Sequence, residues 1–368
     1  MSDSDFGEII ESIEAFLLGG PPTLTRLEVA EQAGVPLELA QELWRQLGFA
    51  HVTDETVAFT ESDVEALQLT IDLMRMGILP PESQAALVRT WGRSYARLAE
   101  WQISLLAGIA VDGPNPEVRL AELAAGVLPR VEALQSYVWR RHLSSASNRL
   151  LTTGTPSNPE REMAVCFVDI VGYTTRSKAL EEDALVEWIE GFEQVATGTV
   201  IDHGGRVIKT IGDEILFTTD EPAAAVEIAL TLTERGMDDE DPFPSVRAGI
   251  AYGLVVSRLG DVFGSTVNIA ARLTSVAKPG TVVVDRGVHD ELTGASAEET
   301  ETETEAEESE EPTEDDDAAD SADAVDSADD SDSEDSPEND YRFRRLRRVS
   351  VKGYARLEAW RLQRPKGD

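Results

Sequence analysis

Two aspartates lie at the ends of short β-type segments, and this arrangement constrains the fold more than any other feature. Asp169 follows the apolar run A-V-C-F-V, and Asp213 lies in the turn I-G-D between two further β-type runs. The residues between these segments have helical character. A strand, a crossover helix and a hairpin in this order would bring the two carboxylates together at one edge of a sheet. Adjacent carboxylates favour Mg²⁺ or Mn²⁺, although a turn-forming role is the alternative for each aspartate alone.

The segment V-G-Y-T after Asp169 predicts a second part of this site. Gly172, Tyr173 and Thr174 stand at the start of the following helical span. Backbone N–H groups at such a helix start are free to meet phosphate oxygens. The sequence therefore predicts a phosphate-binding turn next to the two carboxylates.

Three motifs occur in order along the chain: F-V-D-I-V-G-Y-T, K-T-I-G-D-E and G-D-V-F-G-S-T-V-N-I-A-A-R. Together they resemble the class III nucleotidyl cyclase catalytic domain, over about residues 161–295 and again near 341–362. Three motifs in this order identify the family far more specifically than any one of them would alone. The resemblance implies an α+β catalytic domain over residues 161–368, a ferredoxin-like palm with a mostly antiparallel sheet and covering helices.

The same resemblance implies how the reaction is catalysed. Asp169, Asp213 and the main-chain carbonyl of Ile170 would hold two Mg²⁺ or Mn²⁺ ions per site. Arg272 would stabilise the charge that builds on the α-phosphate, and Asn268 would orient the ribose. Asn268 and Arg272 lie four residues apart, so both fall on one face of a helix. A solvated surface charge is the alternative for the arginine.

The nucleotide base is predicted from two further positions of the resemblance. Lys209 and Asp261 occupy the purine-specifying positions, where guanylyl cyclases typically have Glu and Cys or Ser. A lysine donor and an aspartate acceptor fit the ring nitrogen and amino group of adenine. ATP is therefore the expected substrate, cyclic AMP and pyrophosphate the expected products, and guanylate cyclase the alternative. Lys352, in S-V-K-G-Y, resembles the triphosphate-contacting lysine of the family.

The resemblance also implies the assembly. In this family, one subunit supplies the metal ligands, and its partner supplies the purine-binding and transition-state residues. A single chain that carries both sets predicts a symmetric homodimer with two composite sites. An inactive cyclase fold that only binds nucleotide for signalling is a further alternative. Loss of a metal aspartate or of Arg272 would mark it, and this chain retains all three residues.

Charge is distributed unevenly over the 368 residues. The net charge is −38, but residues 297–340 contain 23 Asp or Glu and no Lys or Arg, which leaves −15 for the rest. This low-complexity segment is expected to be a disordered insertion within the catalytic domain. The acidic remainder argues against general affinity for nucleic acid or anionic membranes, since both need basic surfaces.

The residues before the catalytic domain predict an all-α regulatory or dimerisation domain over 1–148, with a turn-rich linker over 149–160. Residues 24–47 resemble the helix-turn-helix of DNA-binding regulators. The presumed recognition helix carries Glu38 and Glu42 with Arg45 as its one base, which disfavours DNA binding.

The sequence also predicts a cytoplasmic location without a membrane partner. No apolar run approaches the roughly 20 residues that span a bilayer, and the N-terminus lacks a signal-peptide pattern. The single cysteine, Cys166, permits no internal disulfide, which is consistent with a reducing compartment.

Overall fold

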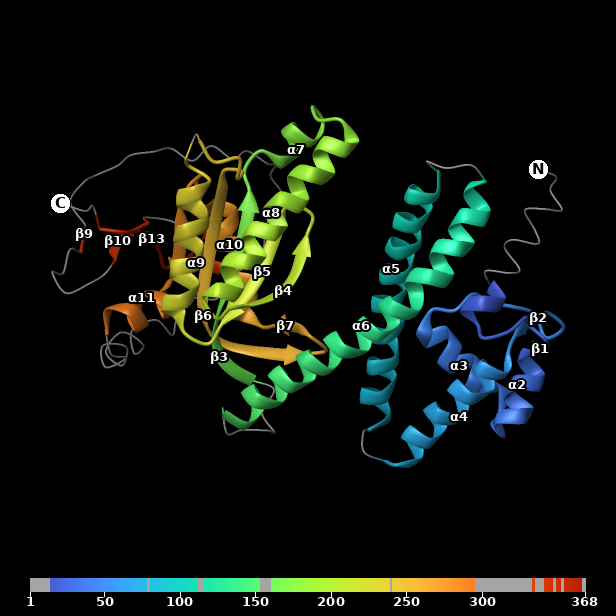
Figure 1. Ribbon diagram of the computed structural model, residues 1–368. Helices are drawn as coiled ribbons and strands as arrows, with labels where there is room; N and C mark the ends of the chain where they lie inside the picture. The colour runs from blue at the N-terminus through green and yellow to red at the C-terminus, as the bar shows by residue number, and fades with distance from the viewer. Residues whose placement is uncertain are drawn as a thin grey trace, which may run out of the picture. The chain divides into compact units, whose positions relative to one another are not determined.

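The computed structural model describes residues 14–77, 80–111, 115–152, 160–238, 240–294, 333–334, 341–346, 349–351 and 354–365 (Figure 1). Lys352 and most of the predicted acidic insertion, residues 297–332 and 335–340, lie outside these ranges. The chain forms two compact units, residues 1–156 and 157–368. Within the described ranges, no helix is both long and apolar enough to cross a membrane.

The first unit is mainly helical. Its elements are β1 (Leu24–Thr25), α2 (Arg26–Ala33), α3 (Leu37–Leu47), β2 (Val57–Phe59), α4 (Glu61–Arg75), α5 (Pro81–Val111) and α6 (Pro116–Thr152). Thr25 and Thr60 cap α2 and α4 through capping boxes with Glu28 and Asp63, which fixes where these helices begin.

Two features of this unit differ from the sequence prediction. Strands β1 and β2 pair as a small antiparallel sheet, which such short strands did not reveal in the sequence. Helix α6 continues through Thr152, so residues 149–152 of the predicted linker are helical. These four residues are Arg, Leu, Leu and Thr, which a helix accommodates, and the turn-forming residues of the predicted linker, such as Gly154 and Pro156, follow the end of α6 in the sequence.

Among the described residues, the second unit is built on a nine-stranded sheet with the order β4-β5-β3-β6-β8-β13-β10-β9, and β7 pairs with β6 outside this path. The strands are β3 (Glu160–Ile170), β4 (Arg206–Ile211), β5 (Glu214–Thr219), β6 (Val246–Arg258), β7 (Asp261–Phe263), β8 (Val282–Asp285), β9 (Ser333–Glu334), β10 (Arg342–Arg345) and β13 (Ala359–Gln363). Strands β6 and β8 are parallel, and the other neighbouring strands in this sheet are antiparallel. The predicted mostly antiparallel palm is confirmed. Strands β11 (Val349–Val351) and β12 (Tyr354–Leu357) form a separate antiparallel pair.

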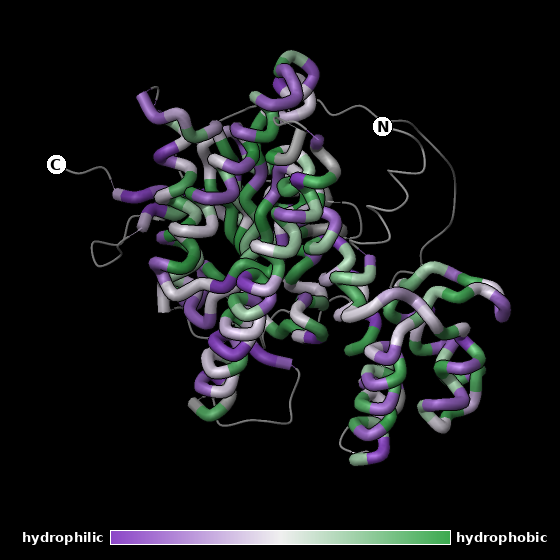
Figure 2. Tube along the Cα trace, turned by 45° about the vertical axis from the view of Figure 1, so that its right-hand side comes forward, coloured by the Kyte–Doolittle hydropathy of each residue, from purple (hydrophilic) through white to green (hydrophobic). Residues whose placement is uncertain are grey.

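Helices cover both faces of this sheet (Figure 1). Helices α8 (Glu182–Asp202), α9 (Pro222–Arg235) and α11 (Arg286–Thr293) pack on one face, and α10 (Ser265–Val276) packs on the other. A short helix, α7 (Tyr173–Ser177), follows β3. Strand side chains alternate between the two faces, with Cys166 and Val168 under α8 and α9, and Val165 and Phe167 under α10. Figure 2 shows hydrophobic residues gathered along the strands in the middle of this unit.

Strand register places three charged residues in one row across the sheet. Strand β3 lies between β5 and β6, and Asp169 is directly opposite Glu214 on β5 and Arg247 on β6. Side chains that are directly opposite each other share a face, so all three lie on the α10 face. The predicted metal-binding aspartate is therefore held in an interior strand, near that strand's end.

Candidate active site

The hairpin that joins β4 and β5 brings Asp213 to Asp169. Ile211 and Glu214 pair across a two-residue turn, and the turn residue Gly212 has a φ of +66°, a conformation that favours glycine. The N–H of Ile170 donates to the carbonyl of Asp213 at 3.1 Å, which fixes the turn against the end of β3. The structure thus brings the two predicted metal ligands together.

The Asp213 carboxyl is close to that of Asp169. Partial burial raises the pKa of Asp213 above its ordinary value, and both the negative charge of Asp169 and a hydrogen bond with it add to the rise. Two carboxylates at this range disfavour each other's ionised forms, and a cation bound between them relieves that repulsion.

Glu214 is a third carboxylate at this end of the sheet, and the sequence analysis missed it. Burial raises its pKa to about 7, and the charges of Asp169 and Asp213 contribute to the rise. Its position directly after Asp213 was visible in the sequence. What the sequence did not show is the strand register that turns its side chain toward Asp169.

Arg247 is a further residue that the sequence analysis missed. Its Nε and Nη2 both donate to Oδ2 of Asp169, at 2.9 Å and 2.7 Å, and its Nη1 donates to the carbonyl of Ser275 at 3.1 Å. The arginine therefore ties the end of β3 to the end of α10. The sequence did contain a signal for this residue: Arg247 is a long charged side chain in a predicted strand, on the same face as the small residues Gly249 and Ala251.

These donors fit a divalent cation that also binds phosphate. Within the described parts of the chain, no group of three or more His, Cys, Asp or Glu side chains is arranged to hold a metal ion. Asp169, Asp213 and the Ile170 carbonyl are hard oxygen donors, but they are too few to complete a coordination sphere. Mg²⁺ and Mn²⁺ commonly bind through one or two carboxylates and take further oxygens from water and substrate phosphates.

Helix α10 carries Asn268 and Arg272 on its exposed side, as the sequence predicted. Among the described residues, neither side chain has a hydrogen-bond or ion-pair partner. The helix lies close to β6 at Gly249, where an added Cβ would be 2.2 Å from the backbone nitrogen of Thr274. Gly249 therefore sets how closely α10, with Asn268 and Arg272, approaches the sheet.

The structure also brings together the two predicted purine-binding residues. Lys209 lies on β4 and Asp261 at the start of β7, and Lys209 Nζ donates to Asp261 Oδ2 at 2.7 Å. Burial opposes ionisation of Asp261, but its bonds with Lys209 and the Val262 N–H outweigh this effect and lower the pKa of the carboxyl. Both side chains stay partly exposed, at 42% and 32%. A donor and an acceptor are thus presented side by side to solvent.

The predicted phosphate turn forms the start of α7. Gly172 precedes this helix, and its carbonyl accepts from the N–H groups of Thr175 and Arg176 at 3.1 Å. Tyr173 stacks on Trp188 of α8 with 6.1 Å between ring centroids, and the Arg176 guanidinium lies 4.6 Å from the same ring. Thr174 is exposed. The stack anchors the turn to α8, directly after β3.

Comparison with known proteins connects these features to a family. The model of the "Adenylate and Guanylate cyclase catalytic domain" matches residues 155–311. A Streptomyces coelicolor protein named adenylate cyclase is 40% identical, over 76% of this chain and 74% of its own length. Adenylate cyclases of Glutamicibacter nicotianae (38% identical, 76% and 74% covered) and Streptomyces griseus (39% identical, 80% and 75% covered) are similarly related. A match over 76% of the chain is longer than the second unit alone, so it includes part of the first unit.

Proposed function

The chain belongs to the adenylate and guanylate cyclase family, and from this premise we propose that it is an adenylate cyclase acting at composite homodimer sites. The reaction joins the ribose 3′-oxygen of ATP to the α-phosphorus. The bond from that phosphorus to the β-phosphate bridging oxygen breaks, the 3′-hydroxyl loses its proton, and pyrophosphate leaves with cyclic AMP as the other product.

In this proposal, Asp169, Asp213 and the Ile170 carbonyl would hold two divalent cations. When bound, the cations lower the pKa of the attacking hydroxyl and neutralise the triphosphate. Arg247 fixes the Asp169 carboxylate, so that its orientation is set before substrate arrives. The backbone N–H groups around Gly172, Tyr173 and Thr174 meet phosphate oxygens, and Lys352 would contact the triphosphate.

Arg272 and Asn268 act on the reacting end of the nucleotide. A guanidinium aimed at the α-phosphate stabilises the transition state more than the ground state, because negative charge grows there as the bond forms. Asn268 orients the ribose through its amide. Both side chains are exposed and have no partner among the described residues of their own chain, which supports a site completed across a two-fold axis.

The contact between Lys209 and Asp261 carries the choice of ATP over GTP. The ammonium group donates to the adenine ring nitrogen, and the carboxylate accepts from the adenine amino group. Their 2.7 Å contact supports this pairing, because it places a donor and an acceptor at the spacing of adjacent groups on one base edge. Guanine presents its donor and acceptor in the opposite order, so the same pair fits it poorly.

The test is cyclic AMP formation from Mn²⁺–ATP by the purified full chain. We expect turnover that falls by at least about a hundredfold in Asp213→Ala, because the metal site loses a ligand. Asp202→Ala, which changes an exposed aspartate at the end of α8, is the matched control and should keep full activity. Turnover of GTP instead of ATP would favour the guanylate cyclase alternative. Failure with both nucleotides would favour an inactive nucleotide-binding fold.

A cytoplasmic location is part of the proposal. It rests on the substrate, ATP, and on the single buried cysteine, Cys166, which fits a reducing compartment.

A further inference from the structure

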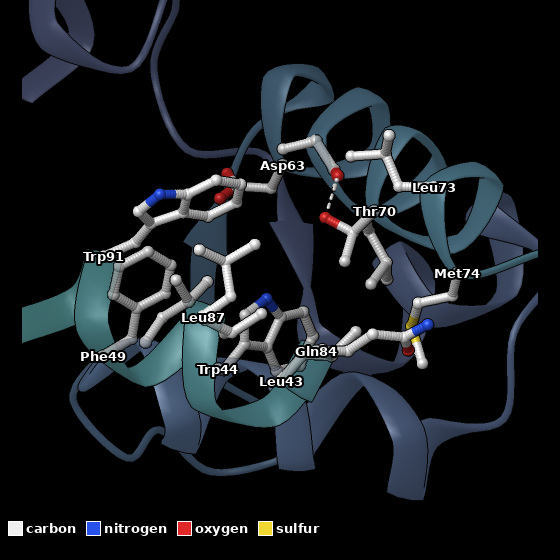
Figure 3. A pocket seen from close by; sticks show the side chains of 14 residues that line it. Leu43, Trp44, Phe49, Asp63, Thr70, Leu73, Met74, Gln84, Leu87 and Trp91 are labelled. Atoms are coloured by element: carbon white, nitrogen blue, oxygen red, sulfur yellow. Dashed lines mark hydrogen bonds between the residues drawn. The ribbon is translucent and has the colours of Figure 1, made fainter. Parts of the chain in front are cut away.

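The first unit contains a cavity of about 380 Å³ between α3, α4 and α5 (Figure 3). Its wall is mostly aliphatic and aromatic. Each helix contributes large apolar side chains to it: Leu43 and Trp44 from α3, Leu67 and Met74 from α4, and Leu87 and Trp91 from α5. The volume lies within the range of small-molecule pockets, which are lined mainly by such residues.

A close contact between two helices fixes part of this wall. Helix α5 meets the end of α3 at Gly92, where an added Cβ would lie only 2.3 Å from the carbonyl oxygen of Leu47. Because the backbones touch there, the positions of the adjoining residue Trp91 and of Leu87, one turn earlier, are set by the helix packing. The shape of this part of the cavity is therefore fixed by how the helices pack.

Two of the polar side chains on the wall, Asp63 and Thr70, are engaged in hydrogen bonds within α4 and its cap. The Asp63 carboxylate accepts the N–H and hydroxyl of Thr60 at 2.7 Å and 3.0 Å, in the capping box of α4. The Thr70 hydroxyl donates to the Ala66 carbonyl at 2.8 Å. No Lys, Arg or His is among the residues that line the cavity in the described part of the chain. An ionic group inside it would lack a counter-charge, and an anion would also face Asp63.

Large apolar side chains of this wall also meet solvent. Phe49, Leu73 and Trp91 are 56%, 56% and 42% exposed. The cavity is therefore accessible, and an apolar occupant would cover side chains that water now contacts. Aromatic residues such as Phe49 and Trp91 offer large contact areas with little conformational freedom to lose.

We propose that this cavity is a binding site for one uncharged, apolar small molecule. The volume sets the size of the ligand, the aliphatic and aromatic wall sets its polarity, and the lack of a free charged group excludes ionic ligands. The site lies wholly within the first unit and does not depend on the function proposed for the catalytic unit.

The experiment compares two fluorescent probes on the full chain. N-phenyl-1-naphthylamine is uncharged, and 1-anilinonaphthalene-8-sulfonate has the same ring skeleton with an added sulfonate. We expect the uncharged probe to bind at one site per chain, at least about tenfold more tightly than the sulfonate, because burying an unpaired charge is unfavourable.

Two variants locate the binding. Ala66→Phe places a ring in the cavity, and Ala96→Phe makes the same change at an exposed position of α5 outside it. We expect Ala66→Phe to weaken binding of the uncharged probe by at least about tenfold, and Ala96→Phe to leave it unchanged. Leu73→Lys supplies a cation at an exposed wall position and should reduce the preference for the uncharged probe by about tenfold or more.

Three results would overturn the proposal. The first is equal affinity of the unchanged protein for both probes. The second is binding of the uncharged probe that Ala66→Phe does not weaken, together with a probe preference that Leu73→Lys does not change, which would place the binding elsewhere on the helices. The third is absence of binding, as expected if a second copy of the chain fills the cavity. Leu73→Lys decides the matter if Ala66→Phe fails to fold, since it changes an exposed side chain.

Discussion

Arg247 donates two hydrogen bonds to one oxygen of Asp169, Oδ2, from Nε at 2.9 Å and from Nη2 at 2.7 Å. The two residues are directly opposite each other on β6 and β3. Their side chains are only 32% and 16% exposed, so the pair is partly shielded from water. The arginine therefore both stabilises the strand ends and fixes the carboxylate proposed to bind metal.

Replacing Arg247 tests both of its roles, the stabilisation of the strand ends and the positioning of the Asp169 carboxylate. A variant of an ordinary ion pair elsewhere serves as the control. We expect Arg247→Met to lower the free energy of unfolding by about 1–3 kcal/mol, because it leaves Asp169 partly buried and unpaired. It should also weaken Mn²⁺ activation of cyclic AMP formation. Arg235→Met breaks another partly exposed pair, with Asp241, and should leave the Mn²⁺ dependence unchanged. Thermal unfolding measures the change in stability, and Mn²⁺ titrations of cyclic AMP formation measure the metal dependence. Equal metal dependence in the Arg247 and Arg235 variants would contradict the positioning role of Arg247.

Gly249 sets the distance between β6 and α10, and a methyl group there has no room. Since an added Cβ would lie 2.2 Å from Thr274 N and 2.6 Å from Ala270 O, Gly249→Ala must push the helix outward. We expect a loss of about 2–3 kcal/mol in the free energy of unfolding, together with reduced cyclase activity.

Gly191→Ala, in the middle of α8, is the matched control because its added Cβ meets open space. It should be neutral or stabilise by up to about 1 kcal/mol. Urea denaturation of both variants provides the comparison, and a Gly249→Ala variant as stable as the parent would show that α10 is not held at this distance.

Lys209 and Asp261 are expected to act as a unit on the adenine base. Lys209→Met and Asp261→Asn should each lower kcat/KM for ATP by about 10–100-fold, since each removes one partner of a buried base edge in the complex. The double variant should lose much less than the product of the two effects, because the residues contact each other. Steady-state kinetics on the unchanged protein, the two single variants and the double variant gives the coupling energy between Lys209 and Asp261. If the loss in the double variant equals the product of the two single losses, the residues do not share a base contact.

We expect Asp285 to make the stability of the catalytic unit depend on pH. It caps α11, and its Oδ1 accepts from the N–H groups of Tyr252 and Val288, while burial raises its pKa to about 6. A carboxyl with a raised pKa in the folded state stabilises the fold below its unfolded pKa. That contribution is then lost as pH rises through the folded value.

The free energy of unfolding should therefore fall by up to about 3 kcal/mol between pH 4 and 6 because of this group, at about 1.36 kcal/mol per pKa unit. Asp285→Asn keeps an Oδ1 acceptor for both N–H groups and should remove this part of the decline. Chemical denaturation at several pH values compares the two proteins, and identical pH profiles would show that Asp285 does not carry the effect.

The sequence was informative where function depends on local patterns and much less so where it depends on register. The apolar run before Asp169 and the I-G-D turn predicted the strands and the approach of the two aspartates. Arg247 was missed because its partner is fixed by the alignment of β3 with β6, which no local pattern encodes. The cavity was missed for a related reason: three helices form its wall, and the close approach of α5 to the end of α3 at Gly92 is not visible in a local pattern.

In the proposed homodimer, each active site draws its metal ligands from one subunit and its transition-state residues from the other. A heterodimer of Asp213→Ala with Arg272→Ala tests it, each subunit carrying a different affinity tag so that only mixed dimers are purified. Both variants should be nearly inactive as homodimers. In the mixed dimer, one site combines both defects and the other is intact, so we predict about half the activity of the unchanged dimer. A mixed dimer as inactive as its parents would contradict this arrangement, since it would mean that each site is built from a single chain.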